Sequence, residues 1–180
     1  MNTEIFEEYT SNLKTQLELI PLDILISWAA DFKTAWKENR HLFICGNGGS
    51  AGNAIHLAND YLYGVSPSSS PAMRVTALTA NSSILTCLGN DVGYENIFSE
   101  QLKTLGQAND ILLVLSGSGN SPNVVKAIKT AKSVGMTSYA LVGFSGGKCM
   151  ELADHCIHVP IQDMQIAEDM QCIIGHMLMQ

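Results

Sequence analysis

The stretch from residue 42 to residue 63, LFICGNGGSAGNAIHLANDYLY, constrains the fold more than any other part of the sequence. It begins with a short apolar run that predicts a buried strand, and four of the seven residues from 46 to 52 are glycine. Glycine lets the backbone turn sharply and approach a ligand closely, because it carries no Cβ. A helical pattern follows directly, and the free N–H groups at a helix start bind anions. The stretch therefore predicts a strand, a phosphate-binding turn and a helix.

That helix carries two side chains suited to acid–base or metal chemistry. His56 and Asp60 are four residues apart, so they lie one above the other on one helix face. Each also has a purely structural interpretation: His56 as an ordinary hydrogen-bonded helix histidine, and Asp60 as a solvated surface acid.

Strand-like and helical patterns alternate from residue 41 onward, which predicts an α/β protein with a parallel sheet and right-handed crossovers. The 46% hydrophobic content suits a sheet covered on both faces. We expect one domain over residues 1–180, with a helical extension at 1–38 and an α/β core at 41–180. The expected strands are 42–45, 74–78, 111–115, 138–142 and 156–159. The expected helices are 50–63, 82–88, 94–105, 122–134, 147–153 and 163–180, and the polar loop 66–71 is a candidate flap.

Residues 3–38 predict two amphipathic helices, at 4–19 and 22–36, with no visible chemistry of their own. Their apolar stripes need a surface to cover them, and a partner subunit is a common one.

Charge and composition exclude several classes of function. The net charge of −7, with only 10 lysines and arginines, argues against nucleic acid as the main partner. It also means that an anion would be held mostly by backbone N–H groups and hydroxyls. The acidic N-terminus is no signal peptide, and no apolar run is long enough to cross a bilayer, so we expect a soluble, cytoplasmic protein. The five cysteines lack metal-site spacing and are expected to be reduced thiols.

A second glycine-serine loop, LSGSGNSP at residues 115–122, follows the third expected strand. Ser121 is a natural N-cap and Pro122 a natural first helical residue. Hydroxyls at Ser116, Ser118 and Ser121 can line the anion pocket that the helix start addresses. Two such loops at the carboxyl ends of parallel strands are what a switch-point binding site requires. Neither loop is a dinucleotide-binding or Walker fingerprint.

With GNGGSAGNAIH and LSGSGNSPNVVKAI both in view, the chain resembles the sugar isomerase (SIS) domain, and most of all the phosphoheptose isomerases. These interconvert sedoheptulose 7-phosphate and glycero-manno-heptose 7-phosphate. The similarity covers essentially the whole chain. It implies a five-stranded parallel sheet flanked by helices, N-terminal helices used in oligomerisation, and a homotetramer with active sites between subunits.

The resemblance also implies roles for particular residues. The phosphate and sugar are expected at Asn47, Gly48, Gly49, Ser50, Asn90, Asp91, Ser116, Ser118, Ser121 and Glu168. The catalytic pair is expected at Asp60 and His176, and one divalent ion per subunit, such as Zn²⁺, at His56, Asp60, Glu168 and His176. Asp60 stands where the family has a glutamate, Glu168 where it has a glutamine, and Gln165 where it has an aspartate. The usual arginine after the first core helix has no counterpart near Gly64.

The residues themselves fit this chemistry. Aldose–ketose isomerisation moves a proton between neighbouring carbons through an enediol, which needs one group at carbon and a second at the oxygens. Glu168 and His176 are eight residues apart, close to two helical turns, so one face presents both. Two histidines and two carboxylates suit a divalent ion. Alternatively, Glu168 simply favours a helix N-terminal turn and His176 is a core histidine.

Three functions remain open on the sequence. The leading hypothesis is an isomerase of a seven-carbon sugar phosphate. The second is a non-catalytic protein that binds a sugar phosphate or a protein partner. The third is an isomerase of another phosphosugar, which fits the missing arginine.

Overall fold

The computed structural model describes residues 3–64 and 71–180, and a five-stranded parallel sheet lies at its centre. The strand order is β2-β1-β3-β4-β5, with every neighbouring pair parallel. The strands are β1 (His41–Cys45), β2 (Arg74–Ala77), β3 (Ile111–Ser116), β4 (Thr137–Val142) and β5 (His155–His158). The α/β class and the five-stranded parallel sheet predicted from the sequence are confirmed.

The central strands are mostly apolar and buried because both faces of the sheet are covered. Successive side chains of a strand point to opposite faces. In β1, Leu42 and Ile44 enter one hydrophobic core, while Phe43 and Cys45 enter the other. The apolar run at residues 42–45 is thus fully buried in a strand.

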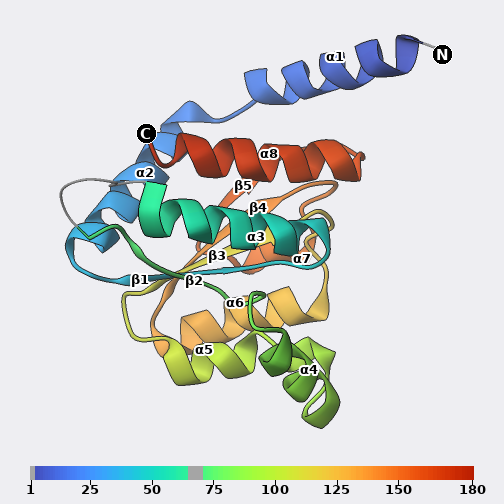
Figure 1. Cartoon of the computed structure of the whole chain (residues 1–180). Helices are drawn as coiled ribbons and strands as arrows, with labels where there is room; N and C mark the ends of the chain where they lie inside the picture. The colour runs from blue at the N-terminus through green and yellow to red at the C-terminus, as the bar shows by residue number, and fades with distance from the viewer. Residues whose placement is uncertain (1–2, 65–70) are drawn as a thin grey trace.

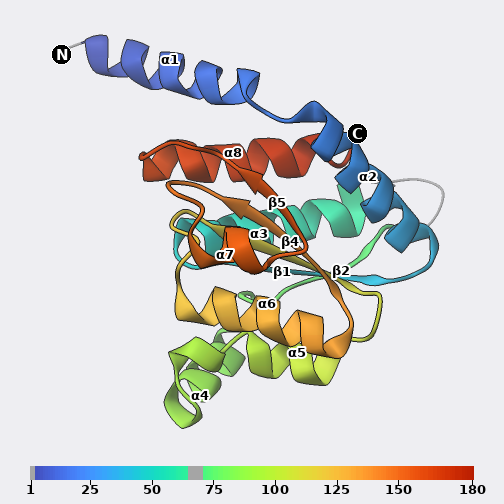
Figure 2. The same cartoon turned by 180° about the vertical axis from the view of Figure 1, so that it is seen from behind.

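Two layers of helices cover the sheet (Figures 1 and 2). One layer holds α2 (Leu22–Lys37), α3 (Gly49–Asn59) and α8 (Met164–Met177), whose buried side chains share a core with Leu42 and Ile44. The other layer holds α4 (Ser82–Asp91), α5 (Ser99–Leu105), α6 (Pro122–Val134) and α7 (Gly147–Leu152). The predicted helices agree with these bounds to within three residues at each end, except as described below.

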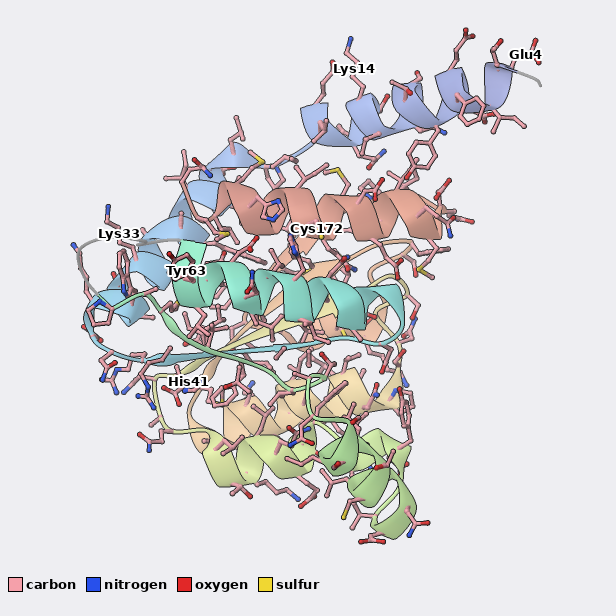
Figure 3. The ribbon with its side chains drawn as sticks, in the orientation of Figure 1. Glu4, Lys14, Lys33, His41, Tyr63 and Cys172 are labelled. Atoms are coloured by element: carbon pink, nitrogen blue, oxygen red, sulfur yellow. The ribbon has the colours of Figure 1, made fainter. Side chains whose placement is uncertain are left out.

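Helix α1 (Glu4–Glu18) extends beyond the body of the domain, with Glu4 and Lys14 well away from the sheet (Figure 3). It is joined to α8 by a hydrogen bond that Tyr9 Oη donates to Asp169 Oδ2 at 2.5 Å. This bond to a carboxylate, with a smaller contribution from burial, raises the pKa of Tyr9 to about 12.

The strand order places a topological switch point between β1 and β3. The chain leaves β1 into α3 on one face of the sheet, and leaves β3 into α6 on the other. The loops after these two strands therefore diverge and leave a crevice at the carboxyl ends of the strands, where open α/β sheets bind their ligands.

Two helices differ from the sequence prediction. The helix expected at 50–63 is α-helical only to Asn59, and Asp60–Gly64 is a π-helical turn. The helix expected at 94–105 is broken into a 3₁₀ turn at Tyr94–Asn96 and α5. Residues 66–70 of the expected flap lie outside the described residues. No helix in the described part of the chain is long and apolar enough to cross a bilayer.

Candidate active site

The two glycine loops line one cavity at the switch point, with a volume of about 260 Å³. We call this cavity the serine pocket. It is lined by Asn47, Gly48, Ser50, Ser116, Gly117, Ser118, Ser121, Met164 and Glu168. The first loop, the second loop and the start of α8 thus meet around one space, as the two-loop pattern predicts. Gly117 and Met164 line the pocket although neither is among the expected site residues.

Three serines of the second loop line the pocket. Ser116 Oγ already accepts the Gly119 N–H at 3.0 Å, and Ser118 Oγ accepts the Asn120 N–H at 3.3 Å. Ser121 is the N-cap residue of α6, yet its hydroxyl makes no cap hydrogen bond. The O–H hydrogens of these serines therefore remain for an acceptor, and a phosphate oxygen is one.

The first turn of α7 holds the serine loop in place through hydrogen bonds of its backbone N–H groups. The Cys149 N–H donates to the Gly119 carbonyl at 2.9 Å, and the Lys148 N–H donates to Asn120 Oδ1 at 3.1 Å. Gly119 has a φ of +66°, and a Cβ there would stand 2.0 Å from the carbonyl oxygen of Gly146. Only glycine fits at this position, so the shape of the loop is set by backbone packing.

Asn47 is held by an amide pair that sequence reasoning missed. Its Nδ2 donates to Asn123 Oδ1 at 2.9 Å, while Asn123 Nδ2 donates back to Asn47 Oδ1 at 2.8 Å. Tyr94 Oη also donates to Asn47 Oδ1 at 3.0 Å. These bonds join the two loops across the switch point. The sequence does contain a signal for this pair, because Asn47 stands between two glycines of the first loop and Asn123 directly follows Ser121 and Pro122 at the start of α6.

A second group of side chains lies further along α3 and α8. We call His56, Asp60 and His176 the histidine cluster. His56 Nε2 and His176 Nε2 are 3.0 Å apart, and Asp60 Oδ2 lies 3.2 Å from His176 Nε2 and 3.4 Å from His56 Nε2. The side chains are 51% (His56), 25% (Asp60) and 44% (His176) exposed. Residues 116 positions apart in the sequence thus meet at one accessible point, as the sequence predicts for Asp60 and His176.

Close packing of α3 against α8 brings the cluster together. A Cβ on Gly175 would stand 2.5 Å from Leu57 Cδ2, so glycine lets the two helices approach at this level. Tyr61 Oη donates to the Gly175 carbonyl at 3.0 Å and fixes the same crossing. Asp60 begins the π-helical turn, a feature that is frequent at functional sites.

The donor set of the cluster fits a divalent metal ion. Its three ligand atoms all lie within 4.8 Å of one another, with separations of 3.0, 3.2 and 3.4 Å. Zinc ligands about 2.0–2.1 Å from the ion at the corners of a tetrahedron stand roughly 3.4 Å apart. Two imidazoles and one carboxylate, with the fourth position open, are a donor set of catalytic zinc sites.

Glu168, expected beside these residues, lies elsewhere in the structure. Its Oε1 accepts the backbone N–H of Ser50 at 3.1 Å, at the start of α3, and its side chain lines the serine pocket. The structure does not bring it into the histidine cluster. The carboxylate does serve a helix N-terminus, but that of α3 rather than its own.

Asn53 of α3 and Cys172 of α8 link the two helices between the serine pocket and the histidine cluster. Asn53 Nδ2 donates to the Glu168 carbonyl at 2.9 Å and to Gln171 Oε1 at 3.1 Å. The Cys172 thiol donates to Asn53 Oδ1 at 3.1 Å, on the side of α8 that faces α3 (Figure 3). Burial, and then the charges of Asp169, Asp60 and Glu168, raise the pKa of this thiol.

Two expected substrate residues lie outside the pocket. Asn90 and Asp91 end α4, where Asn90 Nδ2 donates to Asp91 Oδ1 at 2.8 Å. Neither lines the serine pocket of the same chain. The three remaining histidines have structural partners: His41 with Thr76, His155 stacked on Tyr139, and His158 with the Phe144 carbonyl.

Comparisons with known proteins identify a family for this fold. The family model described as the SIS domain matches residues 6–143. A phosphoheptose isomerase from Akkermansia muciniphila is 43% identical over 142 residues, covering 79% of this chain and 75% of its own. The solved phosphoheptose isomerase from Neisseria gonorrhoeae is 30% identical with a TM-score of 0.88, covering 98% of this chain and 95% of its own. That from Francisella tularensis is 27% identical with a TM-score of 0.91, covering 98% and 93%.

Proposed function

The chain belongs to the SIS domain family, and we propose that it is an isomerase that interconverts sedoheptulose 7-phosphate and glycero-manno-heptose 7-phosphate. The observation that carries the proposal is the 3.2 Å separation of Asp60 Oδ2 and His176 Nε2. This acid–base pair lies on the same two helices as the serine pocket. The substrate of the relatives needs both features, a phosphate site and a proton-transfer pair.

The phosphate is held at the α6 side of the serine pocket. The hydroxyls of Ser116, Ser118 and Ser121 donate to its oxygens, and the first turn of α6 adds the positive end of a helix dipole. No lysine or arginine lines this pocket among the described residues. The site thus relies on hydroxyls and backbone, as the low count of basic residues predicts.

The sugar chain runs from the pocket along α3 and α8 to the histidine cluster. Asp60 removes the proton from the carbon next to the carbonyl, an enediol forms, and the proton returns to the neighbouring carbon. His176 moves protons at the two oxygens. Asp60 is oriented for this role from both sides, because Asn59 Nδ2 donates to its Oδ1 at 3.0 Å while Oδ2 faces the histidines.

A divalent ion such as Zn²⁺, one per subunit, would be held by His56, Asp60 and His176. Bound there, it would polarise the carbonyl and stabilise negative charge on its oxygen. The sequence-based expectation that Glu168 is a fourth ligand remains a prediction, and it requires the carboxylate to leave Ser50.

Assembly completes the proposal. We infer a homotetramer, because α1, its C-cap residue and α2 expose large apolar side chains: Ile5, Phe6, Leu19, Leu22 and Ile26. The cytoplasmic location expected from the sequence remains a prediction. A partner subunit would also cover the exposed histidine cluster and explain why Asn90 and Asp91 lie apart from the pocket of their own chain. Light scattering at micromolar concentration should give four times the chain mass, and a monomer would contradict this assembly.

The direct test is incubation of the purified protein with a panel of ketose phosphates, followed by NMR. Aldose signals should grow with sedoheptulose 7-phosphate, and a protein that binds it without forming aldose would be a sugar-phosphate-binding protein instead. A second candidate, isomerisation of another phosphosugar, is favoured by one observation. The next arginine after α3 is Arg74, the first residue of β2. It lies at the amino end of its strand, whereas the serine pocket lies at the carboxyl ends of the strands, and it donates a hydrogen bond to the Asn39 carbonyl. Faster turnover of another ketose phosphate in the panel would select it.

A further inference from the structure

The amide oxygen of Asn47, a residue that lines the serine pocket, is already occupied by hydrogen bonds within the protein. Asn47 Oδ1 accepts one bond from Asn123 Nδ2 at 2.8 Å and a second from Tyr94 Oη at 3.0 Å, which uses both of its lone pairs. Asn47 Nδ2 carries two hydrogens. One is donated to Asn123 Oδ1 at 2.9 Å, and the other has no acceptor within residues 3–64 and 71–180. Asn47 can therefore offer a ligand only a donor.

The backbone of α6 fixes the direction of these bonds. The Val124 N–H donates to Asn123 Oδ1 at 2.9 Å, and a backbone N–H cannot accept a hydrogen bond. The nitrogen of the Asn123 amide therefore has to face Asn47 Oδ1. Turning the Asn47 amide over would place donor against donor and oxygen against oxygen. Asn123 is buried, so water would not compensate for that mismatch.

Tyr94 reaches Asn47 from a 3₁₀ turn that is anchored to α6. Lys126 of α6 donates to Asn96 Oδ1 at 3.0 Å and forms an ion pair with Glu95 at 3.6 Å, and both partners belong to the turn. The Tyr94 side chain itself is 60% exposed, so little of it is part of the core. Its hydroxyl thus contributes to the orientation of Asn47 far more than to the packing of the domain.

A donor at this position suits the expected ligand. Phosphate and sugar oxygens accept hydrogen bonds, and no lysine or arginine lines the serine pocket among the described residues. Hydrogen bonds in a chain polarise one another, so the bond that Tyr94 donates to the Asn47 oxygen strengthens the free Asn47 N–H as a donor.

We propose that Tyr94 is a positioning residue whose hydroxyl holds the Asn47 amide as a hydrogen-bond donor to the sugar phosphate in the serine pocket. This inference rests on the proposed function for the identity of the ligand. It adds a residue that does not line the pocket to those that control binding. Because Asn47 bonds the ligand before the reaction begins, Tyr94 affects KM rather than kcat.

Tyr94→Phe tests this by calorimetry with glucitol 6-phosphate, an open-chain sugar phosphate that has no carbonyl and cannot isomerise. Loss of the hydroxyl should weaken binding about three- to tenfold, the effect of one neutral hydrogen bond. KM should rise by a similar factor while kcat stays within about twofold. Tyr9→Phe is the matched control, since it removes a tyrosine hydroxyl that also donates to a side-chain oxygen, but on α1, and it should leave the affinity and KM unchanged.

A double-mutant cycle shows whether Tyr94 acts through Asn47. In an Asn47→Ala background, Tyr94→Phe should weaken binding by less than about 1.5-fold, because the amide that it holds is gone. Asn47→Asp keeps an oxygen for Tyr94 but replaces the donor with a second oxygen, so it should weaken binding more than about tenfold. Urea denaturation checks that each variant folds. Tyr94→Phe changes an exposed side chain, so the first measurement stands even if Asn47→Ala does not fold.

Three results would overturn the inference: unchanged affinity in Tyr94→Phe, equal weakening by Tyr94→Phe in both backgrounds, or full affinity in Asn47→Asp. Turnover of sedoheptulose 7-phosphate reports separately. Turnover without the coupling between Tyr94 and Asn47 contradicts this inference alone, and the coupling without turnover contradicts the proposed function alone.

Discussion

The serine pocket and the histidine cluster lie along the same pair of helices, but they are built from different parts of the chain. The pocket is made mainly of glycines and short hydroxyl side chains from the loops after β1 and β3, with Met164 and Glu168 added by the start of α8, and Ser50 and Ser116 are buried. The cluster is made of two exposed histidines and the partly exposed Asp60, near the far ends of α3 and α8. The sheet fixes the first, whereas packing between two distant helices fixes the second.

This difference predicts a division of labour. Groups that hold the phosphate contribute equally to the ground state and the transition state, so their loss raises KM. Groups that move the proton act only as the reaction proceeds, so their loss lowers kcat. Variants at the two ends should therefore change different kinetic constants.

The largest effect is expected for Asp60→Asn. The amide keeps the shape of the side chain but cannot accept the proton, so kcat should fall by about 10²–10⁴. Binding of glucitol 6-phosphate should stay within about threefold of the unchanged protein, because the serine pocket is untouched. Steady-state kinetics and calorimetry measure both. An equal loss in kcat and in binding would mean that the serine pocket and the histidine cluster do not contribute separately to binding and to catalysis.

The next largest effect, on the free energy of unfolding and on phosphate binding, is expected for a change at Gly119, which shapes the serine loop. Gly119→Ala forces a Cβ to within 2.0 Å of the Gly146 carbonyl oxygen, in addition to its positive φ. We expect the free energy of unfolding to fall by about 2–4 kcal/mol, with phosphate binding weakened or lost. Urea denaturation and phosphate-31 NMR titration are the measurements.

Gly135→Ala is the matched control for that variant. Gly135 ends the same helix, α6, with a φ of +85°, but a Cβ there meets only Ala108 at 3.4 Å. It should cost about 1–2 kcal/mol of stability and leave phosphate binding intact. Equal phosphate binding in the two variants would mean that the serine loop does not hold the phosphate.

A smaller effect on binding is expected for Ser118→Ala. Loss of one hydroxyl that bonds a charged group weakens binding by about 1–3 kcal/mol, so KM should rise while kcat stays nearly constant. The free energy of unfolding should change little, because Ser118 Oγ accepts only one long bond, from the Asn120 N–H at 3.3 Å. Unaltered KM and phosphate affinity would move the phosphate away from this loop.

Features that depend on local sequence were predictable. The strand runs, the N-cap position of Ser121 and the shared face of His56 and Asp60 follow from spacing over a few residues. The serine pocket followed as well, because the carboxyl ends of neighbouring parallel strands have to meet at one edge of a sheet.

Features that depend on packing between distant elements do not follow from local patterns, and the meeting of Asp60 with His176 was expected only because the family resemblance supplied both positions. The hydrogen bond from the Ser50 N–H to Glu168 needs α8 to lie close over Gly49, and nothing near residue 168 in the sequence indicates this. The π-helical turn at Asp60 interrupts a pattern that is helical throughout. The Asn47–Asn123 amide pair joins two motifs 76 residues apart that were each recognised separately.

The smallest effect is expected midway between the two ends, for Cys172→Ala. The thiol donates one hydrogen bond to Asn53 Oδ1 and its pKa is raised by burial and by nearby carboxylates, so it is a neutral structural group at pH 7. A partly exposed thiol bond is worth little, and we expect a loss of at most about 1 kcal/mol in the free energy of unfolding. Both kcat and KM should stay within about threefold, since Asn53 keeps its two bonds to α8 through Nδ2. The measurements are urea denaturation and steady-state kinetics on the same preparation. A tenfold fall in kcat would mean that the cluster extends along α8 to residue 172, and a tenfold rise in KM would extend the serine pocket to it; in either case the two ends would no longer be separate sites.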